Sequence, residues 1–270
     1  MDDTRYICKI GEIINDYKVI KQIGKGVFGN VYEVSGNKAL KIIKNEPRFH
    51  KSAKKEIEIL NSIKDVNNKI FCTRIEDSFL YKYHMCIVFD LYGKNLYQVL
   101  KENKFRGLDI NYIKIIGYQL FTCLSYLKEI NIIHRDLKPE NIVQYKENEI
   151  KVIDFGSCYI KNELREHTYI QSRYYRAPEI VLNIQYNYKI DIWSTGCILY
   201  ELFTGYPLFK SKNENILILD HICLLGEPNI LLLDKSKRKY LFFKYNILNN
   251  KYNLIDEYIK YVILNKNLNK

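Results

Sequence analysis

Three short motifs constrain this chain more than any other feature of its sequence. They are HRDLKPEN at 134–141, DFG at 154–156 and APE at 177–179. Each pattern alone is weak, but in this order they offer a base, a metal ligand and a latch for a substrate-binding loop. Phosphoryl transfer suits such a set, because it depends on positioning and charge compensation more than on covalent chemistry.

The first two motifs supply the candidate catalytic residues. Asp136 is placed to accept the proton of a substrate hydroxyl, and Lys138 can neutralise charge on the transferring phosphoryl group. The amide oxygen of Asn141 and the carboxylate of Asp154 are the candidate Mg²⁺ ligands. His134 has the chemistry of a ligand or base, but we interpret it as a packed structural histidine.

A glycine-rich turn, G-x-G-x-x-G-x-V at 24–31, lies between two predicted strands. Glycines let backbone amides approach phosphates closely, and the strand on either side argues against a dinucleotide fingerprint, which opens a helix. Lys41 on the next strand can reach phosphates if an acid holds its ammonium, and Glu56 is the candidate partner. The alternative, a solvated surface Lys and Glu, is disfavoured by the turn upstream.

Composition excludes several classes of protein. A chain of 270 residues with 47% apolar residues suits one large domain or two lobes and is not disordered. No signal-peptide pattern is present, and the most apolar stretch, Ile192 to Phe203, is far shorter than the ~20 residues of a membrane span. The 7 scattered cysteines favour free thiols in a reducing compartment. We expect an intracellular protein without zinc.

The net charge of +11 leaves a nucleic-acid-binding domain as an alternative. However, the basic clusters at 51–55 and 235–239 are short, and Lys is abundant throughout the chain. A solvated basic surface is therefore our interpretation, and we do not expect nucleic acid as a partner. Nucleic-acid binding would instead predict an affinity that falls steeply with salt.

Hydrophobic periodicity predicts an α+β fold with two lobes. The predicted strands and first helix fall at 17–23, 31–34, 39–43, 70–77 and 85–89, and at about 48–64. From Asn95 onward the chain is predicted to be mainly helical, with an amphipathic helix from 110 to about 130. The segment 190–203, apolar nearly all round, predicts a helix buried at the centre of the second lobe. We expect the active site in the cleft between the lobes.

Together these motifs resemble the eukaryotic protein kinases over residues 17 to about 265. The resemblance implies a short N-terminal element at 1–16 and a bilobal kinase domain at 17–270. Its N-lobe, about 17–90, would be an antiparallel sheet plus one helix, and its C-lobe, about 91–270, mainly helical. Asp191 resembles the buried anchor of the catalytic loop. The implied ATP-binding residues, which include a gatekeeper and a hinge, are Ile23, Gly24, Gly26, Gly29, Val31, Ala39, Lys41, Glu56, Phe89, Asp90, Tyr92 and Val143.

The activation segment narrows the resemblance. TYIQSRYYRAPE at 168–179 is similar to the dual-specificity tyrosine-regulated kinases (DYRK) of the CMGC group and to the homeodomain-interacting kinases. The same holds for RFH at 48–50, DFGSC at 154–158, TGYPLF at 204–209 and LDKSKR at 233–238. Residues 6–12 also resemble the element that precedes the kinase domain in DYRKs, so the DYRK family is favoured.

That resemblance implies an ATP- and Mg²⁺-dependent Ser/Thr kinase with autophosphorylation at Tyr169. An ordinary exposed tyrosine is the alternative for Tyr169 in a chain with 24 tyrosines. Arg173 and Arg176 are the candidates to pair the phosphate, and the Arg176 position in these kinases also favours proline after the target residue. We expect protein substrates, a monomer, and a location in the cytoplasm or nucleus.

Two departures from the family pattern affect these expectations. Arg135 replaces the cysteine usual in DYRKs, which offers a further phosphate ligand. No Arg follows Arg238 before the chain stops at Lys270, so we expect a C-terminally truncated kinase fold in which Glu179 lacks its usual partner. A pseudokinase or docking module with impaired turnover is therefore the alternative, although such proteins typically lose a catalytic residue.

Overall fold

The computed structural model describes residues 4–64, 70–160 and 169–266, which form two compact units. The first unit draws on residues 1–99, 118–126 and 139–158, and the second on 100–117, 127–138 and 159–270. Neither unit is continuous in sequence. The N-terminal element at 1–16 and the lobe boundary near residue 90 remain predictions.

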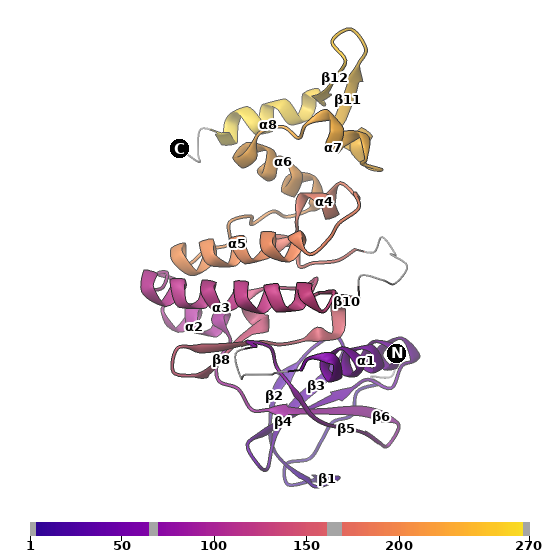
Figure 1. Ribbon diagram of the computed structural model, residues 1–270, viewed down its shortest axis with the longest axis vertical. Coiled ribbons are helices and arrows are strands. Elements are labelled where there is room, and N and C mark those ends of the chain that lie inside the picture. The colour runs from indigo at the N-terminus through magenta and orange to yellow at the C-terminus, as the bar shows by residue number, and fades with distance from the viewer. Residues whose placement is uncertain (1–3, 65–69, 161–168, 267–270) are drawn as a thin grey trace. The chain divides into compact units, whose positions relative to one another are not determined.

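A six-stranded antiparallel sheet dominates the first unit (Figure 1), in the order β1-β2-β3-β4-β6-β5. Its strands are β1 (Ile13–Ile14), β2 (Tyr17–Lys25), β3 (Gly29–Val34), β4 (Lys38–Ile43), β5 (Ile75–Tyr81) and β6 (His84–Asp90). The register places Val31 opposite Lys41, and Ala39 opposite Phe89. The sheet therefore brings predicted nucleotide-binding residues together across neighbouring strands.

Helix α1 (Pro47–Ser62) packs on this sheet and begins with a proline, whose fixed φ suits the first helical position. Phe49 and Ala53 form a buried cluster with Ile43 and Ile87 of the sheet. Glu56 is buried on the same helix, although packing alone would favour an apolar residue there. The buried carboxylate indicates a requirement for its charge.

The strand predicted at 70–77 is wrong in position. Strand β5 begins at Ile75 and continues to Tyr81, where Lys82 and Tyr83 adopt positive φ and turn the chain into β6. The backbone before β5 bonds elsewhere, since the Val152 amide donates to the Phe71 carbonyl at 2.7 Å. The backbone groups near residue 72 are therefore hydrogen-bonded to Val152 and do not extend β5 toward residue 70.

The remaining elements of the first unit are a hairpin and parts of two helices. The hairpin consists of β8 (Ile142–Lys146) and β9 (Glu149–Val152), between 3₁₀ turns at Pro139–Asn141 and Phe155–Ser157. Helices α2 (Leu96–Glu102) and α3 (Ile110–Glu129) each contribute residues to both units. The predicted amphipathic helix from 110 to about 130 is thus confirmed.

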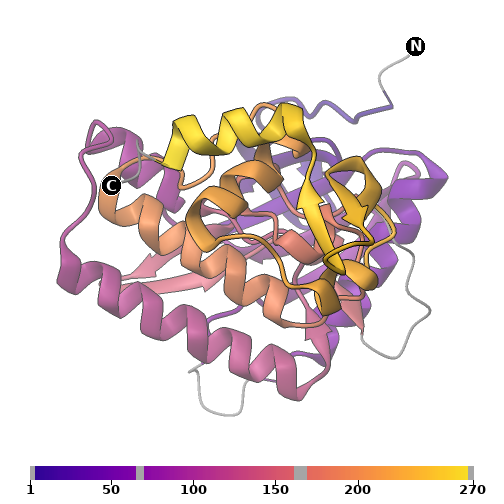
Figure 2. The same cartoon turned by 90° about the horizontal axis from the view of Figure 1, so that it is seen from above.

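The second unit is mainly helical. Its elements are β7 (Ile132–Ile133), β10 (Tyr159–Ile160), a 3₁₀ turn at Arg173–Tyr175, α4 (Pro178–Val181), α5 (Lys189–Thr204), α6 (Glu214–Leu225), α7 (Ile230–Asp234), a 3₁₀ turn at Lys239–Leu241, β11 (Phe243–Asn246), β12 (Lys251–Leu254) and α8 (Asp256–Lys266). Helix α8 lies against α6 (Figure 2), where the Tyr261 hydroxyl donates to Asp220 at 2.8 Å. The predicted α+β class, an antiparallel sheet followed by helices, is confirmed.

Helix α5 forms where predicted, but it is not buried all round. Ile192 and Phe203 are 41% and 60% exposed, whereas the polar residues Asp191, Ser194 and Thr195 are almost fully buried. These three bond neighbouring backbone, as when the Ser194 hydroxyl donates to the Tyr175 carbonyl at 2.7 Å. The buried face of α5 therefore combines apolar side chains such as Ile198 and Leu202 with polar side chains that are hydrogen-bonded to backbone.

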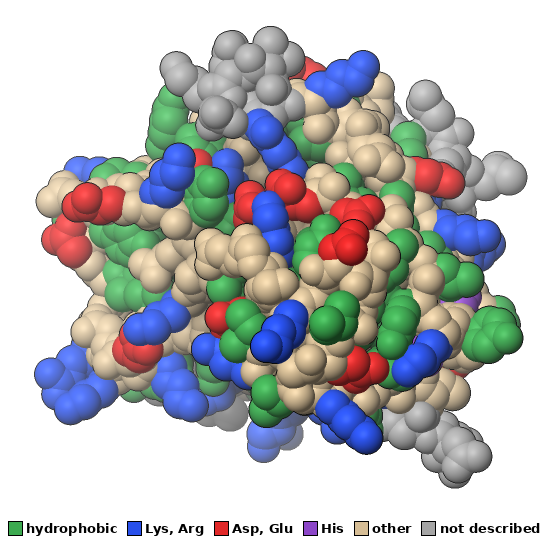
Figure 3. Space-filling model, turned by 90° about the horizontal axis from the view of Figure 1, so that it is seen from below, with side chains coloured by type: hydrophobic (Ala, Val, Ile, Leu, Met, Phe, Trp, Pro, Cys, Tyr) green, Lys and Arg blue, Asp and Glu red, His purple; other side chains and the backbone are tan. Residues whose placement is uncertain are grey.

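Surface charge is mixed. On the face drawn in Figure 3, Lys and Arg side chains are interspersed with Asp, Glu and hydrophobic side chains. A groove that binds nucleic acid would need a continuous basic stripe. No helix in the described ranges has the length and apolar character to cross a membrane.

Candidate nucleotide pocket and catalytic loop

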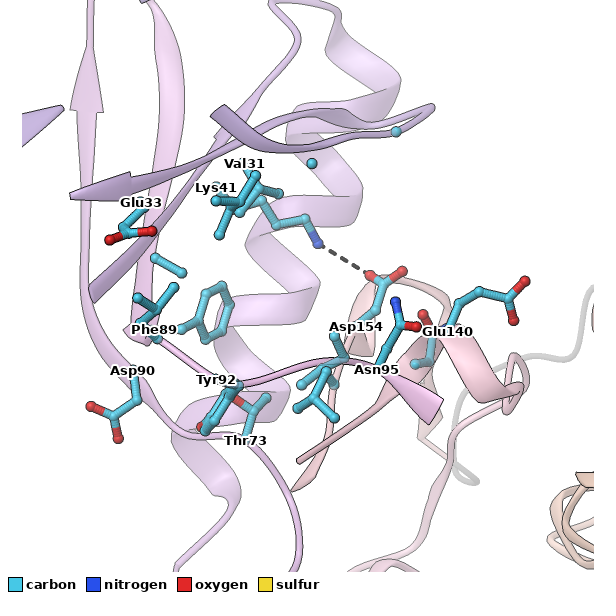
Figure 4. Close-up of a pocket in the computed structure, with 18 of the residues that line it drawn as sticks. Val31, Glu33, Lys41, Thr73, Phe89, Asp90, Tyr92, Asn95, Glu140 and Asp154 are labelled. Atoms are coloured by element: carbon cyan, nitrogen blue, oxygen red, sulfur yellow. Dashed lines mark hydrogen bonds and ion pairs between the residues drawn. The ribbon is translucent and has the colours of Figure 1, made fainter. Parts of the chain in front are cut away.

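The first unit contains a pocket of about 560 Å³, within the size range of small-molecule sites. It lies under the glycine-rich turn between β2 and β3, with walls from β4, β6 and the β8–β9 hairpin (Figure 4). All twelve residues predicted to bind ATP line it, and so do the two predicted metal ligands. These residues come from six separate segments of the chain, so folding brings together residues that are far apart in the sequence.

Apolar side chains shape the part of the pocket suited to a flat ring. Val31, Ala39, Phe89 and Val143 line it, together with Ile153, which the sequence did not single out. The backbone after β6 forms one edge, where the Leu91 amide already donates to the Asn37 carbonyl at 3.0 Å. The predicted hinge residues Asp90 and Tyr92 lie on either side of Leu91 along this edge.

Three charged side chains meet at the other end of the pocket. The Lys41 ammonium lies 2.8 Å from Glu56. It also lies 3.1 Å from Asp154, the contact dashed in Figure 4. Burial alone would lower the pKa of Lys41, but the carboxylates of Asp154 and Glu56 outweigh it and raise that pKa above its ordinary value. Lys41 is therefore fully charged and held in place to meet an anion.

The glycine turn contains one position that only glycine can occupy. A Cβ on Gly29 would lie 1.9 Å from the Ile42 carbonyl oxygen, whereas a Cβ on Gly26 would meet nothing closer than 3.9 Å. Gly29 is thus fixed by the close approach of β3 and β4. Gly26, whose amide donates to the Gly29 carbonyl at 2.9 Å, leaves room above it for a ligand.

Several pocket residues were missed from the sequence. Thr73, Asn95 and Glu140 line the pocket and are labelled in Figure 4. Glu140 lies inside the 134–141 motif, and Asn95 carries the Asx pattern of a helix start, accepting from the Gln98 amide at 2.8 Å. No sequence pattern indicated Thr73 as a pocket residue. Its position depends on β5 beginning at Ile75 and not, as predicted, at residue 70.

In the second unit, Asp136 is surrounded by donors. Lys138 donates to one carboxylate oxygen at 2.7 Å, and the Ser172 hydroxyl donates to the other at 2.8 Å. Ser172 was missed, although it lies directly before Arg173 in the activation segment. These contacts fix the orientation of the Asp136 carboxylate and hold Lys138 beside it.

Asp191 holds the loop that carries Asp136. Its carboxylate accepts the backbone amides of His134 at 2.7 Å and Arg135 at 2.9 Å, and Arg135 has a positive φ of 71°. Burial raises the pKa of Asp191, an effect that the two amides oppose. His134 is fully buried, and its Nδ1 accepts the Asp136 amide at 3.3 Å, as a structural histidine would.

Tyr169 is 67% exposed, and two arginines lie beside it. The Arg176 guanidinium is 3.7 Å from the centre of its ring, and hydrogen bonds from Arg176 and Arg173 lower the pKa of the phenol. Arg135, in contrast, lies over the ring of Tyr159 at 5.6 Å. Two of the three arginines considered from sequence are thus placed at Tyr169.

Comparison with known proteins places these features in a family. The protein kinase domain model matches residues 17–260. The chain is 43% identical over 254 residues to the DYRK-family kinase pom1 of Schizosaccharomyces pombe, covering 90% of this chain and 23% of the relative. It is 42% identical over 250 residues to the dual specificity tyrosine-phosphorylation-regulated kinase 4 of Homo sapiens, covering 87% and 48%.

The dual specificity tyrosine-phosphorylation-regulated kinase 3 of Mus musculus is 44% identical over 236 residues, covering 84% of this chain and 40% of the relative. The chain therefore spans less than half the length of these relatives. The predicted resemblance to the DYRK family is confirmed.

Proposed function

Because the chain belongs to the protein kinase domain family, we propose that it transfers the γ-phosphoryl group of ATP to serine and threonine residues of proteins and autophosphorylates Tyr169. The ion triad of Lys41, Glu56 and Asp154 carries this proposal. A buried ion pair adds little to stability compared with apolar packing. Its presence in a nucleotide-sized pocket is better explained by phosphate binding.

ATP would bind with its adenine between the apolar side chains of Val31, Ala39 and Val143, which line the pocket. The backbone of Asp90 and Tyr92 would hydrogen-bond the ring. Lys41 would contact the α- and β-phosphates, with Glu56 holding its ammonium. The glycine turn would cover the phosphates with backbone amides.

Mg²⁺ fits the donor set that the pocket offers. Asp154 and Asn141 both line the pocket and supply oxygen ligands, which Mg²⁺ prefers. Within the described ranges, no cluster of three or more His, Cys, Asp or Glu could hold a metal alone. That suits an ion that arrives with ATP, keeps phosphate and water ligands, and offsets charge on the phosphates.

The catalytic loop would orient the acceptor. Asp136 would accept the proton of the substrate hydroxyl, and its carboxylate is already aligned by Lys138 and Ser172. Lys138 would then neutralise charge on the transferring group. Neither role requires a covalent intermediate.

The bonds of Arg176 support a preference for proline after the target residue. Its guanidinium donates to the carbonyls of Ile170 at 3.0 Å and Gln171 at 2.7 Å. The Gln171 carbonyl also accepts from Nε at 3.3 Å, so both of its acceptor positions would be engaged and it would not accept the backbone N–H of the residue that follows the target. Proline has no N–H, so it loses nothing there, whereas any other residue would bury an unpaired donor.

Phosphate on Tyr169 would meet the two guanidiniums that already contact the unmodified side chain. Charge-assisted bonds from Arg176 and Arg173 would then order the segment around residues 169–176. The neighbouring residues 161–168 lie outside the described part of the chain.

The pseudokinase alternative rests on Glu179. Glu179 is only half-buried, and no ion pair joins it to any residue in the described ranges. A half-exposed carboxylate retains water, so the cost of leaving it unpaired falls below that of a buried charge. This weakens the reason to expect impaired turnover, and ATP binding without turnover would be the result that supports the alternative.

A comparison of the wild-type protein with an Asp136→Asn variant tests the proposal. We expect phosphate transfer to a protein substrate from the wild type and almost none from the variant; equal transfer would overturn the activity. Mass spectrometry of the protein expressed alone should then find phosphate on Tyr169, absent from a Lys41→Arg variant. ATP binding without either transfer would favour the pseudokinase.

We further propose a monomer that acts on protein substrates inside the cell, in the cytoplasm or nucleus. All seven cysteines are free thiols, which suits a reducing compartment. Size-exclusion chromatography with light scattering would test the monomer.

A further inference from the structure

Arg176 is the most deeply buried arginine described, with 1% of its surface exposed. Its guanidinium donates three hydrogen bonds to the backbone carbonyls of Ile170 and Gln171. It also lies against the ring of Tyr169. Backbone carbonyls are neutral and cannot compensate the charge. A buried guanidinium needs a carboxylate partner to remain there.

Glu214, in the first turn of α6, is that partner. Its Oε1 accepts from Arg176 Nη1 at 3.0 Å, and its Oε2 accepts from Arg238 Nη1 at 3.0 Å. Asn213 caps α6 by accepting the Ile216 amide at 2.9 Å. This cap fixes the start of the helix at Glu214. One carboxylate therefore bridges a buried arginine and a half-buried one.

The outer arginine is itself anchored. Arg238 Nη1 also donates to the Val181 carbonyl at 3.0 Å, and the Arg238 amide donates to the Ser236 hydroxyl at 3.1 Å. Arg238 thus holds the carboxylate oxygen of Glu214 that Arg176 does not bind. The chain of contacts Arg238–Glu214–Arg176 ends on the Ile170 and Gln171 carbonyls.

We propose that Glu214 is a positioning residue for substrate specificity, which holds Arg176 on the Ile170 and Gln171 carbonyls, and that Arg238 braces it. The inference rests on the proposed function, because it concerns how the preference for proline arises. Without the Glu214 charge, the buried guanidinium would turn toward solvent. The vacated carbonyls would then accept the N–H of a residue other than proline, and the preference would weaken.

Glu214→Gln is the central variant, because it keeps size and one hydrogen bond while removing the charge. Arg238→Met removes the brace, and Arg238→Lys retains its charge. Lys237→Ala, an exposed neighbour of Arg238, is the matched control. Each protein is assayed for kcat and KM on two peptides that differ only in proline or alanine after the target serine.

We expect Glu214→Gln to lower the proline-to-alanine ratio of kcat/KM by about five- to tenfold, mainly through faster turnover of the alanine peptide. Arg238→Met should lower the ratio less, and Arg238→Lys and Lys237→Ala should leave it unchanged. A gain on the alanine peptide cannot come from general destabilisation. It therefore separates a positioning role from a structural one.

Two results would overturn the inference and are distinguishable. If the wild type prefers proline and both Glu214→Gln and Arg238→Met keep that preference, Glu214 does not position Arg176. If the wild type is active but shows no preference for proline after the target serine, the proposed preference is wrong. The positioning role of Glu214 is then wrong as well. If Glu214→Gln does not fold, the milder Arg238→Met decides between these outcomes.

Discussion

The ion pair of Lys41 and Glu56 allows a quantitative test of the pocket. Glu56 is 2% exposed, and its carboxylate lies 2.8 Å from the ammonium. A Glu56→Gln variant leaves Lys41 with Asp154 alone, at 3.1 Å. Removing one partner of a buried pair costs ~3–5 kcal/mol, and the surviving carboxylate offsets part of this, so we expect a loss of ~2–3 kcal/mol.

The same loss should appear in catalysis, because Lys41 would no longer be held toward the phosphates. At ~1.4 kcal/mol per tenfold, the expected fall in kcat/KM for ATP is ~30- to 140-fold. The pKa of Lys41 is raised above its ordinary value, so the stability from the pair is complete below the unfolded pKa of about 10 and lost only as pH rises through the higher folded pKa. The difference between the two proteins should therefore be constant from pH 6 to pH 9.

Urea unfolding and steady-state kinetics measure the two effects. The matched control is Glu58→Gln, which makes the same chemical change on the exposed face of the same helix. That control should unfold within ~0.5 kcal/mol of the wild type and keep its kcat/KM. If Glu56→Gln behaves like the control in both assays, the ion pair does not position Lys41 and the reasoning is wrong.

Three further predictions concern packing, pH and the catalytic loop. Gly29→Ala should destabilise by several kcal/mol in urea unfolding, because its Cβ would overlap the Ile42 carbonyl, whereas Gly26→Ala should cost far less. Burial lowers the pKa of His221 to about 3, so between pH 3 and about 6.5 the unfolded state binds a proton that the folded state excludes. The free energy of unfolding should therefore rise with pH over that range. A His221→Phe variant should flatten this rise. Asp191→Asn should lower kcat more than it raises KM for ATP, because the loop backbone loses its charged acceptor.

The pocket could be predicted from sequence because its residues belong to short motifs. A glycine turn, a Lys on the next strand and a Glu on the following helix each have a local pattern, and the sheet register brings them together. Ser172 and Glu214 had no such pattern, since their importance comes from the residues they contact, Asp136 and Arg176. The hydrophobic periodicity of a sequence does not predict contacts between segments that are distant along the chain.

The errors in the fold have the same origin. The strand expected from residue 70 begins at Ile75, because the Phe71 carbonyl and the Thr73 amide bond Val152 of the β8–β9 hairpin. The apolar pattern was present, but the partner that satisfied the backbone was a distant strand. Helix α5 shows the complementary case, in which polar side chains such as Ser194 are buried because they hydrogen-bond backbone groups, while Phe203 is exposed.

The short helix that carries Glu179 shows how such contacts change the interpretation of a motif. The sequence left Glu179 without its usual partner and raised doubt about what secures this segment. The structure shows other anchors at the end of α4, where Ser236 donates to the Leu182 carbonyl at 2.7 Å and Arg238 to the Val181 carbonyl at 3.0 Å. Both carbonyls lie where a helix leaves its backbone acceptors unpaired, so these side chains act as a cap. Because Arg238 also holds Glu214, the contact that secures α4 is continuous with the one that positions Arg176.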